Sequence, residues 1–375
     1  MRCKVKILHS YKSFYPDLFG GIPYVVDIVS RLNPEKFEQS ILVTSATSRS
    51  PEVREGVLIE RVFSWGDLLS LPVAPFYPFK LWLRSRKVDL IVLHAPFPLA
   101  DIVLGLFLGR RKKLIVYWHS HVISQKRAYK FIKPLLLRTL KRADCIILSH
   151  PSLSNDGSIL EPFNAKISII PYAVDTQTFK SSMHPSTSCN ANPRIVACGR
   201  LVKYKGFDVL IEAARFIDAE IVIVGEGIER PALVEQISTA GLSHRVKLIG
   251  NLPQADLIEL MSSAEIFAFP SVSAAETFGI AQIEAMACGC AIVNTHIPTA
   301  VPDVARHDIE AITIQPNDAG ALARAINLLL DNTAMRKRLS TNARARAVAL
   351  YDQRNYELKL SSLLSHVSKG DSHDG

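Results

Sequence analysis

Two glutamates, Glu276 and Glu284, stand eight residues apart around a segment that could form a buried helix. The segment 280–288 carries apolar residues all round, and Gly289 follows where a helix commonly ends in glycine. Glu276 precedes this helix, where free backbone N–H groups favour negative charge. Glu284 is the only charged residue within 277–293, and a carboxylate in such surroundings needs a partner. The pair could therefore contact one ligand at the helix mouth; alternatively, Glu276 is a cap and Glu284 a buried, salt-bridged residue.

Two cations, Arg200 and Lys205, lie on a loop that follows the expected strand 194–197 and is flanked by Gly199 and Gly206. An arginine can bind two phosphate oxygens with its planar fork, and a lysine adds a point charge. The pattern therefore indicates a clamp for a phosphorylated ligand. The alternative is a turn with two solvated cations.

The first half of the chain offers a second phosphate-type loop and a histidine. Gly20 and Gly21 stand between the expected strand 4–8 and the expected helix 22–32, an arrangement that presents backbone N–H groups to a phosphate. A Gly-Gly pair alone is more often only a turn. His119 follows the expected strand 113–118, where a histidine is more often a structural hydrogen-bonding residue than a catalytic one.

Strands and helices alternate along both halves, which predicts parallel sheets with helices on both faces. The further strands that we expect are 41–44, 89–93, 145–149, 167–171, 220–224, 246–249 and 290–293. The further helices are 207–216, 228–240, 321–331, 334–350 and 351–364. The Ser- and Pro-rich segment 181–193 predicts a linker between an N-terminal domain, 1–180, and a C-terminal domain, 194–350. Residues 351–375 would form a helix that returns to the first domain and then a disordered tail.

Composition narrows the class of protein. The chain has 375 residues, 48% of them hydrophobic and 21% charged, which is ordinary for two globular domains. Six cysteines show no zinc-ligand spacing. Because there is no apolar run of about 18 residues and no signal peptide, we expect a cytoplasmic protein.

The charge is uneven. Residues 1–180 hold 26 Lys and Arg against 14 Asp and Glu, whereas the remainder has a net charge of −3. This favours an anionic partner, and without a nucleic-acid motif we expect a membrane surface rather than nucleic acid. The basic amphipathic segment 126–143, which Pro134 should divide into two helices, would hold the protein peripherally on the cytoplasmic face of the inner membrane. Alternatively, it is a helix with a solvated cationic face.

The segment from Phe269-Pro-Ser271 through Glu276-Thr-Phe-Gly279 to Glu284-Ala-Met-Ala-Cys-Gly289 resembles the E-x7-E motif of retaining glycosyltransferases of family 4. The loop Gly199–Gly206, read as Gly-Arg-Leu-x-x-x-Lys-Gly, agrees with it. The resemblance implies the α/β GT-B fold, two Rossmann-like doubly wound parallel-sheet domains facing a central cleft, and a nucleotide-sugar substrate. The segment 117–126 is most similar to mannosyl- and D-rhamnosyltransferases of bacterial O-antigen pathways, although His121 stands where those enzymes have Asp.

The resemblance also implies the residues of the donor site. The diphosphate would lie against Arg200, Lys205 and the backbone N–H groups of Gly20, Gly21, Phe278, Gly279 and Ile280. Glu284 would bind the ribose hydroxyls, Glu276 the donor sugar, and His119 would position that sugar near the reacting centre. Gly225, Gly227 and Leu252 would frame the base. Since no Asp-x-Asp marks a metal site, we expect no metal or other cofactor, and Arg200 and Lys205 would stabilise the leaving diphosphate.

The expected function is transfer of a hexose, mannose or D-rhamnose, from a GDP-linked donor to a lipid-linked saccharide with retention of configuration. Two alternatives are a sugar-nucleotide epimerase of the same fold and a non-catalytic scaffold that binds nucleotide sugars.

Overall fold

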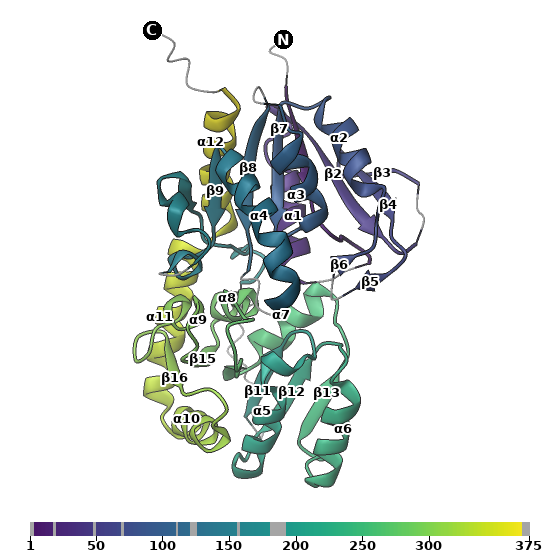
Figure 1. Cartoon of the computed structure of the whole chain (residues 1–375). Helices are drawn as coiled ribbons and strands as arrows, with labels where there is room; N and C mark the ends of the chain where they lie inside the picture. The colour runs from purple at the N-terminus through teal and green to yellow at the C-terminus, as the bar shows by residue number, and fades with distance from the viewer. Residues whose placement is uncertain are drawn as a thin grey trace. The chain divides into compact units, whose positions relative to one another are not determined.

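The computed structural model describes residues 4–17, 20–47, 50–68, 71–109, 112–120, 126–155, 158–180 and 193–369. The chain divides into two compact units (Figure 1). One comprises Met1–Pro171 with Tyr356–Gly375, and the other comprises Tyr172–Asn355. The predicted linker 181–193, except for Pro193, and the end of the chain beyond Lys369 lie outside the described residues.

The first unit contains an eight-stranded sheet with the order β10-β9-β8-β7-β1-β2-β4-β3. Its strands are β1 (Val5–Ser10), β2 (Phe37–Ser45), β3 (Glu52–Arg54), β4 (Val57–Phe63), β7 (Leu90–Ala95), β8 (Lys113–Trp118), β9 (Cys145–Leu148) and β10 (Ile167–Ile169). All neighbouring strands pair in parallel except β3 and β4. A small antiparallel pair, β5 (Asp67–Leu68) with β6 (Leu71–Pro72), stands apart from this sheet.

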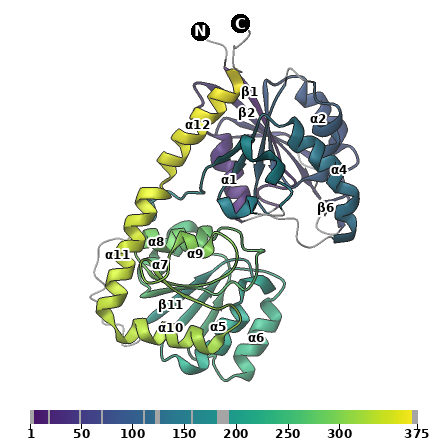
Figure 2. The same cartoon turned by 60° about the vertical axis from the view of Figure 1, so that its left-hand side comes forward.

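Helices cover both faces of this sheet, as expected for parallel strands that are buried on both sides. They are α1 (Gly21–Ser30), α2 (Tyr77–Ser85), α3 (Pro98–Leu106), α4 (Lys126–Arg142), α12 (Gln353–Lys369) and the short 3-10 helices η1 (Pro151–Ser154) and η2 (Glu161–Lys166). Figure 2 shows α1 and α12 on one side of the sheet and α2 and α4 on the other. From Tyr356 onward α12 belongs to the first unit, and the hydroxyls of Tyr356 and Tyr117 lie 3.1 Å apart.

The predicted division of segment 126–143 at Pro134 is wrong, because α4 runs through that proline as one helix. A proline inside a helix costs about 3 kcal/mol. Packing offsets this cost, since Leu136 and Leu140 of α4 are buried in the same apolar core as Leu104 of α3.

The second unit contains a six-stranded parallel sheet with the order β13-β12-β11-β14-β15-β16. Its strands are β11 (Arg194–Cys198), β12 (Glu220–Val224), β13 (Val246–Ile249), β14 (Ile266–Phe269), β15 (Ala291–Thr295) and β16 (Ala311–Ile314). Its helices are η3 (Lys203–Lys205), α5 (Phe207–Ala213), η4 (Ala214–Phe216), α6 (Arg230–Thr239), α7 (Gln254–Ser262), α8 (Ile280–Cys288), α9 (Val301–Val304), α10 (Ala319–Asp331) and α11 (Thr333–Leu350). One apolar core joins β11, β12 and β14 to α5 and α10.

Within each sheet the chain changes the direction in which it adds strands. The reversal lies between β1 and β7 in the first unit and between β11 and β14 in the second. Loops after the carboxyl ends of these strands are the places where parallel α/β sheets bind ligands. A ligand-binding site is therefore expected at the reversal point of each unit.

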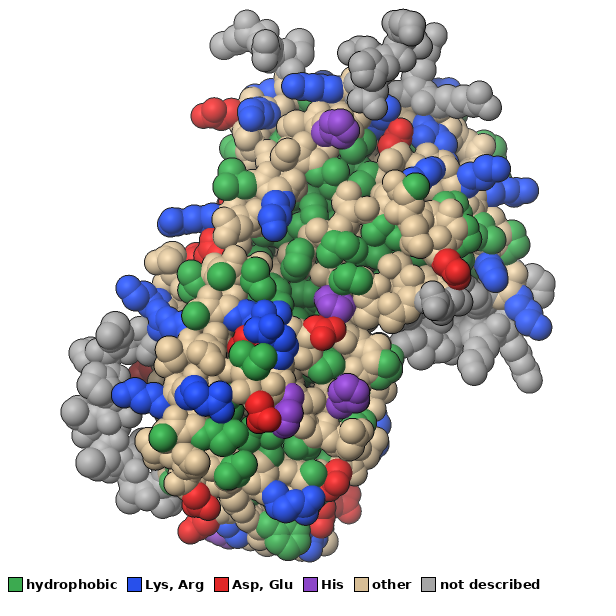
Figure 3. All heavy atoms as spheres, turned by 90° about the vertical axis from the view of Figure 1, so that its left-hand side faces the viewer, with side chains coloured by type: hydrophobic (Ala, Val, Ile, Leu, Met, Phe, Trp, Pro, Cys, Tyr) green, Lys and Arg blue, Asp and Glu red, His purple; other side chains and the backbone are tan. Residues whose placement is uncertain are grey.

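No described helix is long and apolar enough to cross a membrane. On the face shown in Figure 3, Lys and Arg side chains lie singly or in small groups, several of them beside Asp or Glu side chains.

Candidate functional site

The two motifs singled out in the second half follow the two strands at its reversal point. The loop Gly199–Gly206 comes directly after β11, and the segment from Pro270 to Gly279 comes directly after β14. Because β11 and β14 are neighbours, loops far apart in the sequence meet at one edge of the sheet. Val272 N donates to Tyr204 O at 2.8 Å and joins the two loops directly.

Lys205 and Glu276 form the centre of this site. Lys205 Nζ lies 2.5 Å from Glu276 Oε2, and their side chains are only 12% and 11% exposed. Ser271 Oγ donates to the same carboxylate at 3.3 Å. Burial disfavours the charged form of Lys205, but Glu276 and Tyr204 outweigh it, so the pKa of Lys205 lies above its ordinary value. A cation that is held charged and largely shielded from water suits an anionic ligand.

Arg200 is exposed, and its Nη2 donates to the Tyr204 hydroxyl at 2.9 Å. Lys205 Nζ lies 5.9 Å from the centre of the same tyrosine ring and 5.1 Å from that of Phe269. Tyr204 thus stands between the two predicted clamp residues. Tyr204 was not predicted as a site residue, although it lies within the Gly-Arg-Leu-x-x-x-Lys-Gly pattern.

Glu284 lies on the second turn of α8 and is only partly exposed. Burial raises the pKa of Glu284 to about 7, and the positive charge of Lys205 opposes this rise. Burial also raises the pKa of the Cys198 thiol, with Glu284 and Lys205 as its charged neighbours. Glu284 thus lies near Lys205, but Lys205 forms its ion pair with Glu276 and not with Glu284.

Gly225 and Gly227 have a packing role that the sequence did not reveal. A Cβ on Gly225 would lie 2.0 Å from Gly199 O, and one on Gly227 would lie 2.3 Å from Leu201 O. Leu201 N also donates to Glu226 O at 2.9 Å. These glycines let the turn after β12 support the loop that carries Arg200. Leu252, also predicted to frame the base, is partly buried on the loop after β13.

The three residues at the start of α8 differ in their surroundings. Phe278 is buried against Tyr172 and Tyr351, with ring centres 5.0 Å and 6.0 Å apart. Gly279 has a left-handed backbone (φ 85°), and a Cβ there would lie 3.0 Å from the Phe269 ring. Ile280 begins the helix, and N–H groups in a first turn have no acceptor within their own helix.

In the first unit, α1 begins at Gly21, and the preceding Gly20 is exposed, with nothing within 4 Å of the position a Cβ would take. His119 follows β8 and is 1% exposed. Its Nε2 lies 2.9 Å from Nδ1 of His94, and its ring stacks on Tyr117. Burial lowers the pKa of His119 to about 3, so the imidazole is neutral near pH 7.

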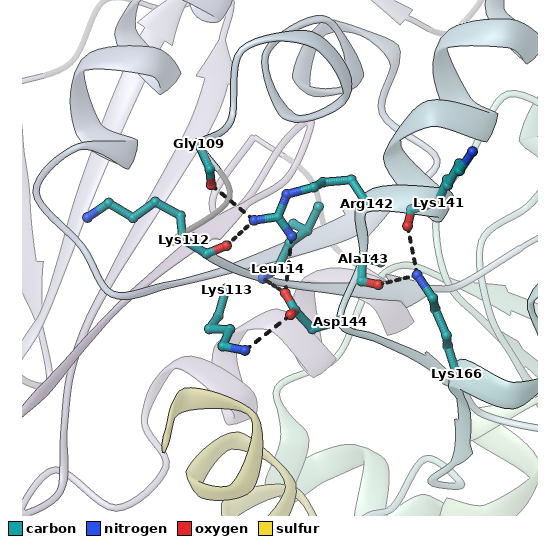
Figure 4. Close-up of polar contacts among 9 residues, drawn as sticks. All are labelled: Gly109, Lys112, Lys113, Leu114, Lys141, Arg142, Ala143, Asp144 and Lys166. Carbon is teal, nitrogen blue, oxygen red and sulfur yellow. Dashed lines mark hydrogen bonds and ion pairs between the residues drawn. The ribbon is translucent and has the colours of Figure 1, made fainter. Parts of the chain in front are cut away.

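The opposite end of this sheet holds a cluster of charges with a structural role (Figure 4). Asp144 accepts from the Leu114 backbone N–H at 2.8 Å and pairs with Lys113 at 3.3 Å and Arg142 at 3.4 Å. Lys166 Nζ donates to the carbonyls of residues 141 and 143, each at 2.7 Å. These contacts secure the amino ends of β8 and β9.

The structure therefore brings Lys205, Glu276 and Glu284 together in the second unit, with Arg200 bonded to the neighbouring Tyr204, and places Gly20, Gly21 and His119 in the first. His121 lies outside the described residues. Among the described residues, no group of His, Cys, Asp and Glu is arranged to hold a metal ion. The cluster in the second unit can bind an anion through Lys205 and Arg200, and hydroxyl groups through the two carboxylates.

Comparison with known proteins identifies the family. Residues 20–178 match the model described as "Glycosyltransferase Family 4", and residues 182–346 match "Glycosyl transferases group 1". A phosphatidylinositol N-acetylglucosaminyltransferase subunit of Arabidopsis thaliana is 33% identical over 87% of this chain and 75% of its own length. The chain belongs to glycosyltransferase family 4. The predicted family is thus confirmed.

Bacterial relatives align over nearly the whole of this glycosyltransferase. An O-antigen chain mannosyltransferase of Escherichia coli is 28% identical over 91% of this chain and 93% of its own. A D-rhamnosyltransferase of Pseudomonas aeruginosa is 25% identical over 92% of each chain.

Solved structures agree on the fold. The sucrose-phosphate synthase of Thermosynechococcus elongatus has a TM-score of 0.82 at 21% identity and covers 96% of this chain and 98% of its own. HepE of Anabaena, solved with UDP and glucose, has a TM-score of 0.78 at 20% identity over 96% and 99%. The predicted α/β architecture of GT-B type, with two Rossmann-like units, is confirmed.

Proposed function

We propose that this glycosyltransferase transfers a hexose, mannose or D-rhamnose, from a GDP-linked donor to a lipid-linked saccharide during synthesis of a cell-surface polysaccharide. The relatives whose names specify mannosyl and D-rhamnosyl transfer support the choice of sugar. The observation that carries the proposal is the convergence of Lys205, Glu276 and Glu284 at the reversal point of the second sheet.

In this proposal the donor diphosphate binds Lys205, Arg200 and the N–H groups at the start of α8. The diphosphate oxygens replace Glu276 as the ionic partner of Lys205. The Glu276 carboxylate then accepts hydrogen bonds from hydroxyls of the donor sugar. Glu284 accepts from the ribose hydroxyls. Gly225, Gly227 and Leu252 line the base, while Gly20, Gly21 and His119 of the first unit contact the diphosphate and the sugar.

The reaction breaks the bond between the anomeric carbon and a diphosphate oxygen and forms a bond from that carbon to an acceptor hydroxyl oxygen. We propose retention of configuration, with the hydroxyl proton passing to the leaving diphosphate. Negative charge grows on the diphosphate as the bond breaks. Lys205 and Arg200 are cations already in place, so they stabilise that charge with little reorganisation and without a metal.

We further propose that the enzyme works at an anionic membrane surface, where a lipid-linked acceptor would lie. Helix α4 carries the exposed side chains of Lys130 and Lys141, and the first unit also exposes the aromatic side chains of Trp65, Phe76 and Phe79. Cations add about 1 kcal/mol each near an anionic surface. Aromatic side chains favour the boundary between headgroups and acyl chains.

The test is thermal denaturation in the presence of nucleoside diphosphates and their sugars. A ligand at about 100 times its Kd adds roughly 2.7 kcal/mol, and we expect this stabilisation from GDP and GDP-mannose. The double substitution Arg200→Ala and Lys205→Ala should abolish it, whereas Lys337→Ala, which removes an exposed cation of α11, should not. Stabilisation by UDP alone would contradict the GDP-linked donor.

A second measurement separates transfer from the other activities that this fold could support. GDP-mannose incubated without acceptor should be recovered unchanged, and addition of a lipid-linked saccharide should release GDP and yield a mannosylated lipid. Conversion of the nucleotide sugar in the absence of acceptor would indicate an epimerase. No conversion with any acceptor would indicate a binding scaffold.

A further inference from the structure

The parallel strands of the first sheet begin at one edge, which we call the amino edge, and this edge is strongly basic. It consists of the first residue of each of the seven parallel strands and the four residues before it. Among the described residues, these positions hold ten Lys and Arg against four Asp and Glu, a net charge of +6. A large part of the excess positive charge in the first half of the chain therefore lies at one end of the first unit.

The corresponding edge of the second sheet is acidic. For its six strands, the same positions hold two Arg against five Asp and Glu among the described residues, a net charge of −3. A cation at the end of a helix interacts favourably with the helix dipole, and Arg245 of this edge donates to Ile217 O at 2.6 Å. Because the second unit has the same architecture with only two such cations, the helix ends do not account for the charge of the first.

Two cations of the basic edge are held by backbone carbonyls. Lys112 Nζ donates to two carbonyls just before β7, at 2.6 Å and 3.2 Å. Lys166 Nζ donates to two carbonyls just before β9, each at 2.7 Å (Figure 4). A carbonyl group has no net charge, so these bonds fix the positions of the two ammonium groups without neutralising them.

Three lysines at the neighbouring strands β7, β1 and β2 are available to a partner. Lys87, Lys4 and Lys36 lie just before these strands, in that order. All three side chains are exposed, and none of them forms an ion pair with a described residue. Neighbouring strands lie about 4.8 Å apart, so these lysines form a short row of cations along the amino edge.

Two exposed apolar side chains lie within this basic surface. Leu106 ends α3 and Phe107 follows it, and their side chains are 48% and 62% exposed. The carbonyl of Gly109, two residues further on, accepts from Arg142 of the charged cluster in Figure 4 at 3.0 Å. The amino edge can therefore contact apolar groups as well as anionic ones.

We propose that the amino edge of the first unit binds an extended acidic segment of a partner protein. Carboxylates of the segment pair with the fixed and the free cations, and an apolar side chain of the segment contacts Phe107. At about 4.8 Å between neighbours, seven strands span roughly 29 Å, the length of about nine residues of an extended peptide. The partner is thus defined by its negative charge and by the length of the segment that the edge can hold.

The position of the amino edge favours a protein partner over a lipid surface. This step rests on the proposed function, in which Gly20, Gly21 and His119 at the carboxyl ends of the strands contact the donor. The strands β1, β7 and β8 have six residues each, so the two edges of the sheet lie about 20 Å apart. A lipid-linked acceptor has to reach the carboxyl edge, which leaves the amino edge open to a different anionic partner.

Fluorescence anisotropy of a labelled peptide tests the proposal. The probe is a peptide of about nine residues, all Glu except for a central Phe, and its counterpart has Gln in place of every Glu. At low ionic strength the acidic peptide should bind the wild-type protein, and added salt should weaken this binding. The Gln peptide should not bind.

Two double substitutions form a matched pair. Lys36→Glu with Lys87→Glu reverses two exposed charges of the amino edge and should weaken binding of the acidic peptide at least about fivefold. Lys130→Glu with Lys133→Glu reverses two exposed charges in the first half of α4, away from that edge, and should leave the affinity within about twofold of wild type. Both variants should keep the circular dichroism spectrum of wild type.

Three results would overturn the proposal. One is equal affinity of the acidic peptide for wild type and for the amino-edge variant. Another is binding to phosphatidylglycerol vesicles that the amino-edge variant loses while its peptide binding is unchanged, because a lipid surface would then be the partner. The third is self-association of the wild-type chain that the same variant abolishes, because a second copy of the chain would then occupy the edge.

The two proposals fail separately, because the peptide assay contains no nucleotide. A protein that binds the acidic peptide as described but binds and converts no nucleotide sugar would refute the proposed function. A protein that transfers mannose from GDP-mannose but binds the peptide no better than the amino-edge variant does would refute the docking surface and leave the function standing.

Discussion

Replacing Glu284 by Gln should stabilise the second unit at alkaline pH and abolish nucleotide binding. The pKa of Glu284 rises from 4.5 to about 7, mainly because the carboxylate is buried. The fold therefore prefers the protonated carboxyl group. Stability falls as pH rises from the unfolded pKa through the folded one, and the full cost of the buried charge is reached above about pH 8.

The size of the effect follows from the shift. At roughly 1.4 kcal/mol for each unit of pKa, the rise in the pKa of Glu284 from 4.5 to about 7 would lower the free energy of unfolding by about 3 kcal/mol at alkaline pH. Because the side chain is partly exposed, we expect a loss of about 1–3 kcal/mol. Gln is neutral and similar in shape, so Glu284→Gln should gain that amount near pH 8.5. The corresponding rise in Tm is roughly 3–10 °C for a domain of this size. Near pH 5 the gain should almost disappear.

The assay can separate the two units. All three tryptophans, Trp65, Trp82 and Trp118, lie in the first unit, so tryptophan fluorescence follows that unit and circular dichroism follows both. The control is Glu220→Gln, because Lys247 and Arg194 lower the pKa of Glu220, although its burial opposes them. That substitution should destabilise the protein. A Glu284→Gln variant that is no more stable than wild type at pH 8.5 would show that burial does not penalise the charged form of Glu284.

Three further predictions concern the scaffold. Gly225→Ala should lower the free energy of unfolding by about 3 kcal/mol or more, because its Cβ would lie 2.0 Å from Gly199 O. Gly241→Ala, with open space around the new Cβ, should lower it by only about 1 kcal/mol. Equal losses for the two variants in urea denaturation would contradict this prediction. The first unit should lose stability as pH falls from about 6.5 to 4, by about 3 kcal/mol for the buried His9 alone. In this range the unfolded state binds a proton on His9, whereas the buried imidazole of the folded state stays neutral. Urea denaturation followed by tryptophan fluorescence that shows the same stability across this pH range would contradict this prediction. Asp144→Asn should destabilise the same unit by about 1–3 kcal/mol, because it removes a carboxylate that pairs with Lys113 and Arg142. A loss below about 0.5 kcal/mol would show that the bonds from nearby cations to backbone carbonyls hold the amino ends of β8 and β9 without this carboxylate.

Much of the framework was predictable because its signals are local. Gly289 ends α8 in the left-handed conformation that its position predicted. Most strands of the two sheets were predicted, with ends shifted by a few residues, but β4, β14 and β16 were not. The short exposed strand β3 was missed because it has no apolar alternation, and Pro134 was misread because burial of α4 outweighs the local preference of proline.

The residues of the candidate site could be predicted from the sequence, but not which of them form an ion pair. Lys205 and Glu276 are 71 residues apart in sequence and meet only because β11 and β14 are neighbours in the sheet. In one interpretation of the sequence Glu284 was the buried, salt-bridged residue, whereas in the structure Glu276 is paired with Lys205. The contact between His94 and His119 depends on the register of β7 and β8, which no single stretch of sequence specifies.

Calorimetric titration of GDP and of guanosine into wild type and Lys205→Met is the most direct test of the central claim that Lys205 holds the donor diphosphate. We expect GDP to bind the wild-type enzyme and to bind Lys205→Met at least about tenfold more weakly, because a charge-assisted contact contributes roughly 1.5–3 kcal/mol. Guanosine, which has no phosphate, should bind both proteins equally. Equal affinity of the two proteins for GDP would contradict the account.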